Sequence, residues 1–241
     1  CGMRIVLLLF CLCMVAWAHE TDSLFVPKKP AKPVRFCKAA KQWIAYAKAD
    51  SNLVEITYMK GLRMDLRYAT FDNVTGHDLY CGIRRAFVHK DALPKLKRAI
   101  ALLRKEMPGA TLVVFDAARP LYAQSALKRA VAGTPYSNYV SSGKTGGLHN
   151  YGLALDIGVA DSTGTMLDMG TDFDSFERCA GEVGEVEALQ SGRLTQQQVD
   201  NRNLFRKIMK RAGWVPLSSE WWHFNAYTRT YTKENYPLFP M

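Results

Sequence analysis

Residues 147–156 read Gly147-Leu148-His149-Asn150-Tyr151-Gly152-Leu153-Ala154-Leu155-Asp156, and this stretch indicates how the chain folds. It leads from a glycine-rich loop into an apolar segment, Leu153 to Val159, that is typical of a buried strand. His149 ends the loop, and Asp156 lies inside the apolar segment. A carboxylate on a buried strand is costly unless it is paired or binds a metal, so Asp156 requires a partner.

Other apolar segments lie on either side of this strand in the sequence. Leucine and isoleucine at helical spacing predict a helix over Asp91 to Met107, with Asp91 as its cap and Pro108-Gly109 as its stop. Strands are expected over Thr111 to Phe115 and Trp221 to Ala226. Helices are expected over 121–132 and 201–212, and a glycine follows each of the two helices. The irregular order favours an α+β fold with a small mixed or antiparallel sheet flanked by helices, rather than a doubly wound sheet.

The composition is that of an ordinary globular chain. With 241 residues, 48% hydrophobic and 22% charged, it can bury one good core, which makes disordered, collagenous and multi-span membrane architectures unlikely. Six cysteines are too few for a disulfide-dense scaffold. We expect one compact domain over residues 53–241, preceded by a basic, proline-containing lead-in over 19–52 with a possible short helix from Ala39 to Ala49.

The first 18 residues have the layout of a secretory signal peptide. Arg4 is followed by an apolar run from Ile5 to Val15 and by Ala16-Trp17-Ala18, and the run is too short to favour a membrane anchor. We therefore expect an exported protein, periplasmic or secreted, with no stable anchor after cleavage. The net charge of +10 suits acidic envelope polymers, and export excludes nucleic acid as a partner.

A second polar group lies near the C-terminus, within Ser219-Glu220-Trp221-Trp222-His223-Phe224. Glu220 and His223 are three residues apart, so only a kink or a strand end would turn both inward. Two imidazoles and one carboxylate are a usual ligand set for catalytic zinc, and a nearby glutamate can act as the base. Two unrelated, satisfied polar pairs in a core explain the spacing equally well.

The remaining polar candidates carry less information. Arg119 follows a predicted strand, where a guanidinium can stabilise an oxyanion or hold a loop. His77 and His89 have no recognisable ligand spacing, and we expect surface or hydrogen-bonded core roles for them. Ser142-Gly143-Lys144-Thr145 lacks the first glycine of a phosphate-binding loop, and no Gly-x-Ser-x-Gly elbow supports a serine hydrolase.

Taken together, these motifs resemble the D-alanyl-D-alanine dipeptidases among the zinc DD-peptidases, the family of the vancomycin-resistance dipeptidase. The resemblance extends from about Leu53 to Phe239 and rests on six motifs in the same order. They are 65–70 (Asp-Leu-Arg-Tyr-Ala-Thr), 72–76 (Asp-Asn-Val-Thr-Gly), 116–120 (Asp-Ala-Ala-Arg-Pro), 149–156, 169–174 (Met-Gly-Thr-Asp-Phe-Asp) and 220–223 (Glu-Trp-Trp-His).

The resemblance implies a role for each matching residue. It implies one zinc ion per chain, bound by His149, Asp156 and His223. Glu220 would be the general base and later the proton donor, and Arg119 would stabilise the transition state. Tyr68 and Asp174 would recognise the free amino end of the dipeptide. The family has Ser-x-His where this chain has Gly147-Leu148-His149, so one ligand contact differs.

Three functions follow from the resemblance, and they differ in what they cleave or bind. The leading one is zinc-dependent hydrolysis of the D-Ala-D-Ala dipeptide to two D-alanines. A zinc carboxypeptidase or endopeptidase acting on peptidoglycan stem peptides is the second. The third, an inactive wall-peptide binding protein, conflicts with an intact Glu220 beside the expected ligands.

Overall fold

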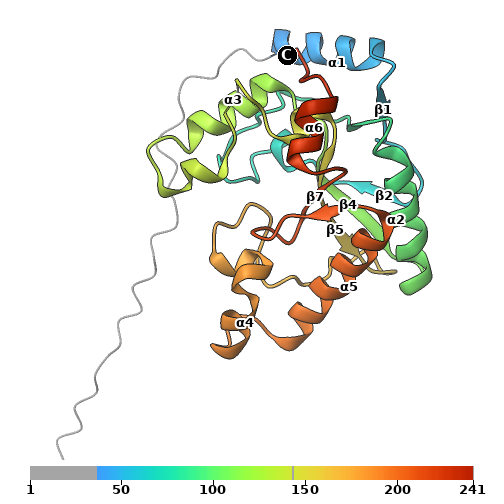
Figure 1. Ribbon diagram of the computed structural model, residues 1–241, viewed down its shortest axis with the longest axis vertical. Coiled ribbons are helices and arrows are strands. Elements are labelled where there is room, and N and C mark those ends of the chain that lie inside the picture. The colour runs from blue at the N-terminus through green and yellow to red at the C-terminus, as the bar shows by residue number, and fades with distance from the viewer. Residues whose placement is uncertain (1–36, 143, 241) are drawn as a thin grey trace, which may run out of the picture. The chain divides into compact units, whose positions relative to one another are not determined.

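The computed structural model describes residues 37–142 and 144–240, so the signal peptide expected over 1–18 and most of the lead-in lie outside the described residues. The described part is an α+β fold, as the sequence predicts (Figure 1). The α-helices and strands are α1 (Cys37–Ala49), β1 (Leu53–Glu55), β2 (Leu62–Met64), β3 (Phe87–His89), α2 (Leu93–Glu106), β4 (Thr111–Asp116), α3 (Leu121–Ala130), β5 (Ala154–Ala160), α4 (Glu182–Gln190), α5 (Gln196–Ala212), β6 (Val215–Pro216), β7 (His223–Asn225) and α6 (Arg229–Asn235). Short 3-10 turns are η1 (Arg67–Ala69), η2 (Pro135–Tyr139), η3 (Leu148–Tyr151) and η4 (Arg178–Ala180).

The main sheet of the described region is small and mixed. Its strands follow the order β2-β4-β5-β7-β6, with β2 parallel to β4 and the other neighbours antiparallel. A separate two-stranded antiparallel sheet pairs β1 with β3. The register of β4 on β5 shifts between Val114 and Asp116, which is a β-bulge. This bulge decides which face of the sheet receives the last residue of β4.

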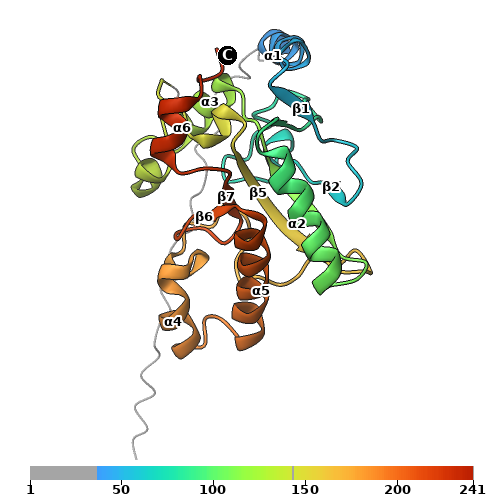
Figure 2. The same ribbon diagram turned by 45° about the vertical axis from the view of Figure 1, so that its right-hand side comes forward.

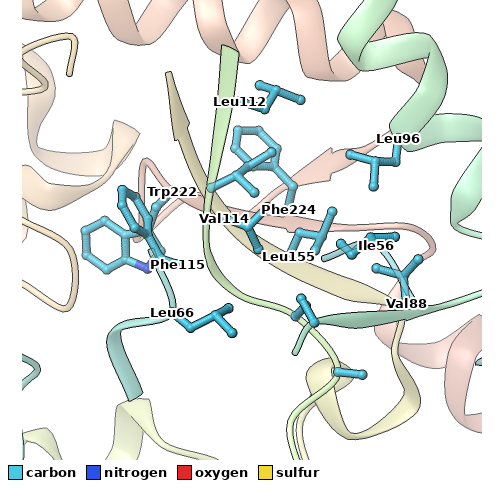
Figure 3. Packing of buried hydrophobic residues seen from close by; sticks show 14 of the residues in the cluster. Ile56, Leu66, Val88, Leu96, Leu112, Val114, Phe115, Leu155, Trp222 and Phe224 are labelled. Carbon is cyan, nitrogen blue, oxygen red and sulfur yellow. The ribbon is translucent and has the colours of Figure 1, made fainter. Parts of the chain in front are cut away.

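Both faces of the sheet contribute buried apolar residues, and one of these faces packs against α2 and α5. Figure 3 shows Leu112 and Val114 of β4 on the same side as Leu155 of β5 and Phe224 of β7. The neighbouring helices α2 and α5 contact each other, and α2 also contacts β4 (Figure 2). Phe205 of α5 meets the ring of Phe224 edge-on, with centroids 5.0 Å apart. The opposite face is also partly apolar, since the ring of Phe115 lies 5.2 Å from that of Phe173, and it carries the polar residues of the candidate site as well.

The core extends towards the N-terminus beyond the expected start of the domain at Leu53. Trp43 of α1 is 1% exposed, and its ring lies 5.4 Å from that of Phe239 near the C-terminus. Ala40 and Ala47 are buried on the same face of α1. The helix expected over Ala39 to Ala49 is thus present, and it packs on the core rather than standing apart from it.

Several element boundaries differ from the expected ones. Asp91 was expected to cap α2 and does not: the N-cap is Ala92, and the Asp91 carboxylate accepts a hydrogen bond from Tyr236. α5 begins at Gln196 rather than 201, because Thr195 and Gln198 form a reciprocal capping box.

Other elements are shorter than expected, and two helices were not expected at all. β7 is limited to His223–Asn225, since the Trp221 amide donates to the Ala180 carbonyl outside the sheet. α3 ends at Ala130 instead of 132. No pattern in the sequence predicted α4 or α6. Within the described ranges, none of the helices combines the length and apolar character that crossing a bilayer requires.

Candidate active site

Three polar side chains form one row across the middle strands of the sheet. Asp116 of β4 is paired with Asp156 of β5, and Asp156 is paired with His223 of β7. Directly paired residues on neighbouring antiparallel strands point to the same face. Without the bulge, Asp116 would share the face of Val114, so the irregularity brings the third polar residue into the row.

His149 reaches this row from η3, which is tied to the end of β4. The Arg119 amide donates to the His149 carbonyl at 3.0 Å, and the Asn150 side-chain amide donates to the Arg119 carbonyl at 2.7 Å. Gly152 then turns the chain into β5 with φ = 65°. A Cβ there would lie 2.8 Å from the His89 amide nitrogen, so this turn requires glycine.

The three expected ligand atoms converge on one point. His149 Nε2 lies 3.2 Å from His223 Nδ1 and 3.3 Å from Asp156 Oδ2, while His223 Nδ1 lies 2.9 Å from Asp156 Oδ1. All three residues are buried or nearly so, with 3–9% of their surface exposed. Ligand atoms about 2.0–2.1 Å from a tetrahedral zinc lie about 3.3 Å from one another. The observed separations therefore suit a metal ion of this kind.

The remaining ring nitrogens support this interpretation. His149 Nδ1 lies 2.9 Å from the Ala117 carbonyl, which can only accept, so Nδ1 carries the proton and Nε2 presents a lone pair. His223 Nε2 lies 2.9 Å from Asn225 Oδ1, which likewise directs the lone pair of Nδ1 inward. Two facing lone pairs beside a carboxylate repel one another unless a cation lies between them, so the donor set fits a metal.

In the ligand cluster, which consists of His149, Asp156 and His223, the imidazoles and the carboxylate interact electrostatically. Burial alone would raise the pKa of Asp156, but His149 and His223 lower it far below its usual value. Burial alone would lower the pKa of His223, yet the hydrogen bond and negative charge of Asp156 raise it to about 9, so a proton on Nδ1 can take the place between the two groups that a metal cation would otherwise hold. The cluster therefore attracts positive charge.

Glu220 lies just before β7, where the chain turns, so that it and His223 both face inward. Its Oε2 is 3.8 Å from His223 Nδ1, and the side chain is 22% exposed. Burial raises the pKa of Glu220, and the nearby Asp156 charge acts in the same direction, while His223 opposes it. A carboxyl group with a raised pKa beside a metal site can both accept and return a proton.

Arg119 is held in the site by the third member of the row. Asp116 accepts from Arg119 Nε at 2.8 Å and from Nη2 at 2.6 Å, and the Tyr80 hydroxyl donates to the same carboxylate. Arg119 Nη1 donates to Gln124 at 2.9 Å, and Nη2 lies 3.7 Å from Asp156 Oδ2. The guanidinium is therefore fixed beside the ligand cluster.

Tyr68 and Asp174 form a separate polar pair in the same cavity. The Tyr68 hydroxyl donates to Asp174 Oδ1 at 2.9 Å, while the buried Oδ2 has no hydrogen-bond partner among the described residues. Asp174 has φ = 62°, an uncommon conformation for a residue other than glycine. Burial and then the Asp156 charge raise the pKa of Asp174 to about 8. A cation is the partner that this carboxylate lacks.

All seven residues expected from the sequence line one cavity of about 240 Å³. That volume is below the range of about 300–1,000 Å³ found for drug-sized ligands. His77 and His89 lie elsewhere, and the buried His89 accepts the Asp91 amide and contacts the Tyr236 ring, a core role as expected.

Sequence reasoning missed the supporting residues Asp116, Gln124 and Asn225. The sequence did indicate Asp116, because it is a carboxylate at the end of an apolar strand, where burial requires a partner, as it does for Asp156 within its strand. It also indicated Asn225, since residues two apart on a strand share a face and Asn225 follows His223 at that spacing. It did not indicate Gln124, because the role of Gln124 depends on where α3 packs.

Comparisons with known proteins identify related sequences. A family model described as D-ala-D-ala dipeptidase matches residues 50–240. The D-alanyl-D-alanine dipeptidase of Escherichia coli K12 is 36% identical over 163 residues, covering 68% of this chain and 78% of that protein. A protein of the same name from Enterococcus faecalis V583 is 27% identical over 72% of this chain and 90% of its own length. Another, from Streptomyces coelicolor, is 28% identical over 69% of this chain and 86% of its own length.

Proposed function

The chain belongs to the D-Ala-D-Ala dipeptidase family of zinc metallopeptidases, and from this premise we propose that it hydrolyses D-alanyl-D-alanine to two molecules of D-alanine. The observation that carries the proposal is the set of converging, tautomer-fixed ligand atoms of His149, Asp156 and His223 beside Glu220. These three residues would hold one zinc ion. The zinc ion supplies Lewis acidity, which lowers the pKa of water and polarises the scissile carbonyl.

The protein's own side chains provide the proton transfers. Glu220 takes a proton from the attacking water, and its raised pKa lets it hold that proton until the leaving amine needs it. Arg119, fixed by Asp116, donates hydrogen bonds to the oxygen that becomes negative in the transition state. Both groups line the same cavity as the ligands.

Substrate recognition at the amino end falls to Tyr68 and Asp174. The unpartnered Asp174 Oδ2 supports this role, because a substrate ammonium supplies the missing donor and charge. The second candidate, cleavage of a D-Ala residue from longer stem peptides, depends on whether an uncharged amide can occupy the same place. The small volume of the cavity favours the dipeptide.

The experiment that tests the proposal compares two variants at the same position. Zinc-loaded wild-type protein should release D-alanine from D-Ala-D-Ala. Glu220→Gln should retain zinc and lose roughly two to four orders of magnitude in kcat, the usual contribution of a positioned acid–base group. Glu177→Gln, another carboxylate that lines the cavity but pairs with Arg193, is the matched control and should keep most of its turnover. Near-normal turnover in Glu220→Gln would place the base elsewhere.

We also propose export with loss of residues 1–18, on the basis of Arg4, the apolar run and Ala16-Trp17-Ala18. Mass spectrometry of the protein recovered from its host would give a mature chain beginning at His19. A chain that keeps residues 1–18 and sediments with membranes would contradict cleavage.

A further inference from the structure

The substrate of the proposed function has two charged ends, and only one has been given a binding partner so far. This inference rests on that function. An α-ammonium matches Asp174, which leaves the α-carboxylate of the C-terminal residue to be bound. Among the residues that line the cavity, Arg119 and Arg229 are the two with a permanent positive charge.

Arg119 is already committed within the site. It makes two contacts below 3 Å with Asp116, donates to Gln124 and lies with its guanidinium carbon 4.7 Å from the centre of the Tyr68 ring. Its charge therefore compensates a buried carboxylate and serves the reacting carbonyl. It is poorly placed to compensate a second carboxylate as well.

Arg229 is in the opposite situation. It is the first residue of α6, a helix that contacts η3, the turn that carries the ligand His149. Its guanidinium forms no ion pair and no hydrogen bond with any residue of the described ranges, in contrast to Arg67, Arg85, Arg193 and Arg206, which are all paired with carboxylates. Arg229 is thus a cation at the cavity that has no anionic partner among the residues that the structure describes.

Ser141 also lines this cavity, and its hydroxyl has no hydrogen-bond partner in the described part of the chain. Its carbonyl accepts from Gln124 Nε2 at 2.8 Å, so its backbone is tied to the side chain that also holds Arg119. A Cβ built on Gly147 would lie 3.4 Å from Ser141 Oγ. The Ser141 hydroxyl thus borders the space that the absent side chain of Gly147 leaves open, and no protein group within the described residues hydrogen-bonds to it.

We propose that Arg229 and Ser141 together bind the α-carboxylate of the C-terminal residue of the substrate. The guanidinium supplies the charge, and the hydroxyl donates a hydrogen bond to a carboxylate oxygen. With Asp174 binding the ammonium, the two ends of the dipeptide are held apart and the scissile carbonyl lies between them, near the ligand cluster. The enzyme then requires a free C-terminus, which excludes endopeptidase activity.

The test uses a substrate pair that differs only at that end, D-Ala-D-Ala and its C-terminal amide. Wild-type protein should prefer the acid by about tenfold or more in kcat/KM, since a hydrogen bond to a charged group is worth about that factor. Arg229→Gln should raise KM for the acid about tenfold, with kcat nearly unchanged, and should leave the amide within about threefold of wild type. Arg229→Lys should recover part of the preference.

Lys233→Gln is the matched control, because it removes the same charge from the same short helix at an exposed position that does not line the cavity. It should keep the wild-type preference for the acid. If Arg229→Gln keeps that preference too, or weakens acid and amide equally, Arg229 does not bind the carboxylate and the inference is wrong. Failure of the wild-type protein to cleave either compound would instead refute the proposed function.

The role of Ser141 is tested separately, by removing its hydroxyl and then introducing a hydroxyl at the neighbouring position 147. Ser141→Ala should reduce the preference for the acid by about threefold to tenfold. Combining it with Gly147→Ser should restore most of the preference, because position 147 has φ = −103°, which any residue can adopt, and a hydroxyl returns to the same space. An unchanged preference in Ser141→Ala would remove Ser141 from the subsite.

Discussion

The ligand cluster and the proposed substrate-binding wall of the cavity, formed by Asp174, Arg229 and Ser141, differ in how completely their polar atoms are hydrogen-bonded. In the cluster, each imidazole has its outer nitrogen fixed by a protein oxygen, and Asp116 is saturated by Arg119, Tyr80 and the Ala117 amide. In the wall, Asp174 Oδ2, the Arg229 guanidinium and the Ser141 hydroxyl have no hydrogen-bond partner among the described residues. Under the proposed function, the catalytic part is therefore formed in advance, and the substrate completes the hydrogen bonds of the recognition part.

The largest expected effect comes from removing a ligand on the satisfied side. His223→Ala should lose zinc and activity together, because His223 is a proposed metal ligand and also the cross-strand partner of Asp156. Metal analysis and D-alanine release, measured on the same preparation, check this. His89→Ala, a buried histidine outside the cluster, is the control and should keep zinc. Full zinc content in His223→Ala would refute the ligand assignment.

On the unsatisfied side, the substrate rather than the protein can be changed. N-acetyl-D-Ala-D-Ala should be cleaved at least about a hundredfold less well than D-Ala-D-Ala, because acetylation removes the ammonium charge that would pair with the Asp174 carboxylate. Asp174→Ala should reduce the difference in kcat/KM between the two substrates, mainly by lowering kcat/KM for the free dipeptide. Comparable kcat/KM values for the two substrates in wild-type protein would favour the carboxypeptidase alternative.

A smaller effect is expected from the supporting residues of the cluster. Asn225→Ala removes the acceptor that orients His223 and should cost about 10–100-fold in zinc affinity or activity, the usual range for such partners. Titration with a zinc chelator gives the affinity. Asn235→Ala, whose amide donates to a helical carbonyl on the surface, should have no effect on zinc binding. Equal zinc affinity in Asn225→Ala and wild type would show that the cluster does not depend on its outer hydrogen bonds.

The smallest expected effect is on the pH dependence of protein stability, because burying Asp174 without a cationic partner destabilises the folded state when the carboxyl is ionised. With a folded-state pKa of about 8, the carboxyl keeps a proton that the unfolded chain releases near pH 4. Stability therefore falls as the pH rises from about 4 to 8, and the loss persists above pH 8. In zinc-free protein, Asp174→Asn should raise the Tm by about 2–4 °C at pH 9 and by less at pH 4.5.

Asp168→Asn provides a control of opposite sign for this experiment. Hydrogen bonds from Gln198 and the Gly170 amide lower the pKa of Asp168, so its contribution to stability is present at neutral and high pH and is lost in acid. Replacing it should therefore lower the Tm at pH 9. A pH-independent difference between Asp174→Asn and wild type would show that Asp174 ionises normally.

Much of the fold was predictable because apolar periodicity and glycine stops are local signals. α2, β4 and β5 follow their predicted ranges to within a few residues. The start of α5 was missed because its first turn is polar and depends on the Thr195 capping box. α4 has almost no apolar periodicity along GEVGEVEALQ and is placed by tertiary contacts, which a sequence pattern does not encode.

The candidate site was less predictable than the strands that carry it. Buried polarity identified Asp156, and motif resemblance supplied roles for Glu220, Arg119, Tyr68 and Asp174. What the sequence could not give was the row of Asp116, Asp156 and His223, because it depends on a bulge and on strand register. The sequence also gave no sign that Arg229 and Ser141 lack partners within the described ranges, since a missing partner can be recognised only once the neighbouring residues are placed.

The row of Asp116, Asp156 and His223 across the strands would also make the stability of the folded chain depend on the concentration of free zinc. Asp156 and His223 are 67 residues apart in sequence, and His149 is 74 residues from His223, so an unfolded chain cannot present the three ligands together. A zinc ion held by these three residues would therefore bind the native state in preference, and each tenfold rise in free zinc above the dissociation constant would add about 1.4 kcal/mol to the free energy of unfolding. We expect zinc depletion to lower the stability of the folded chain and its resistance to proteolysis together with its activity.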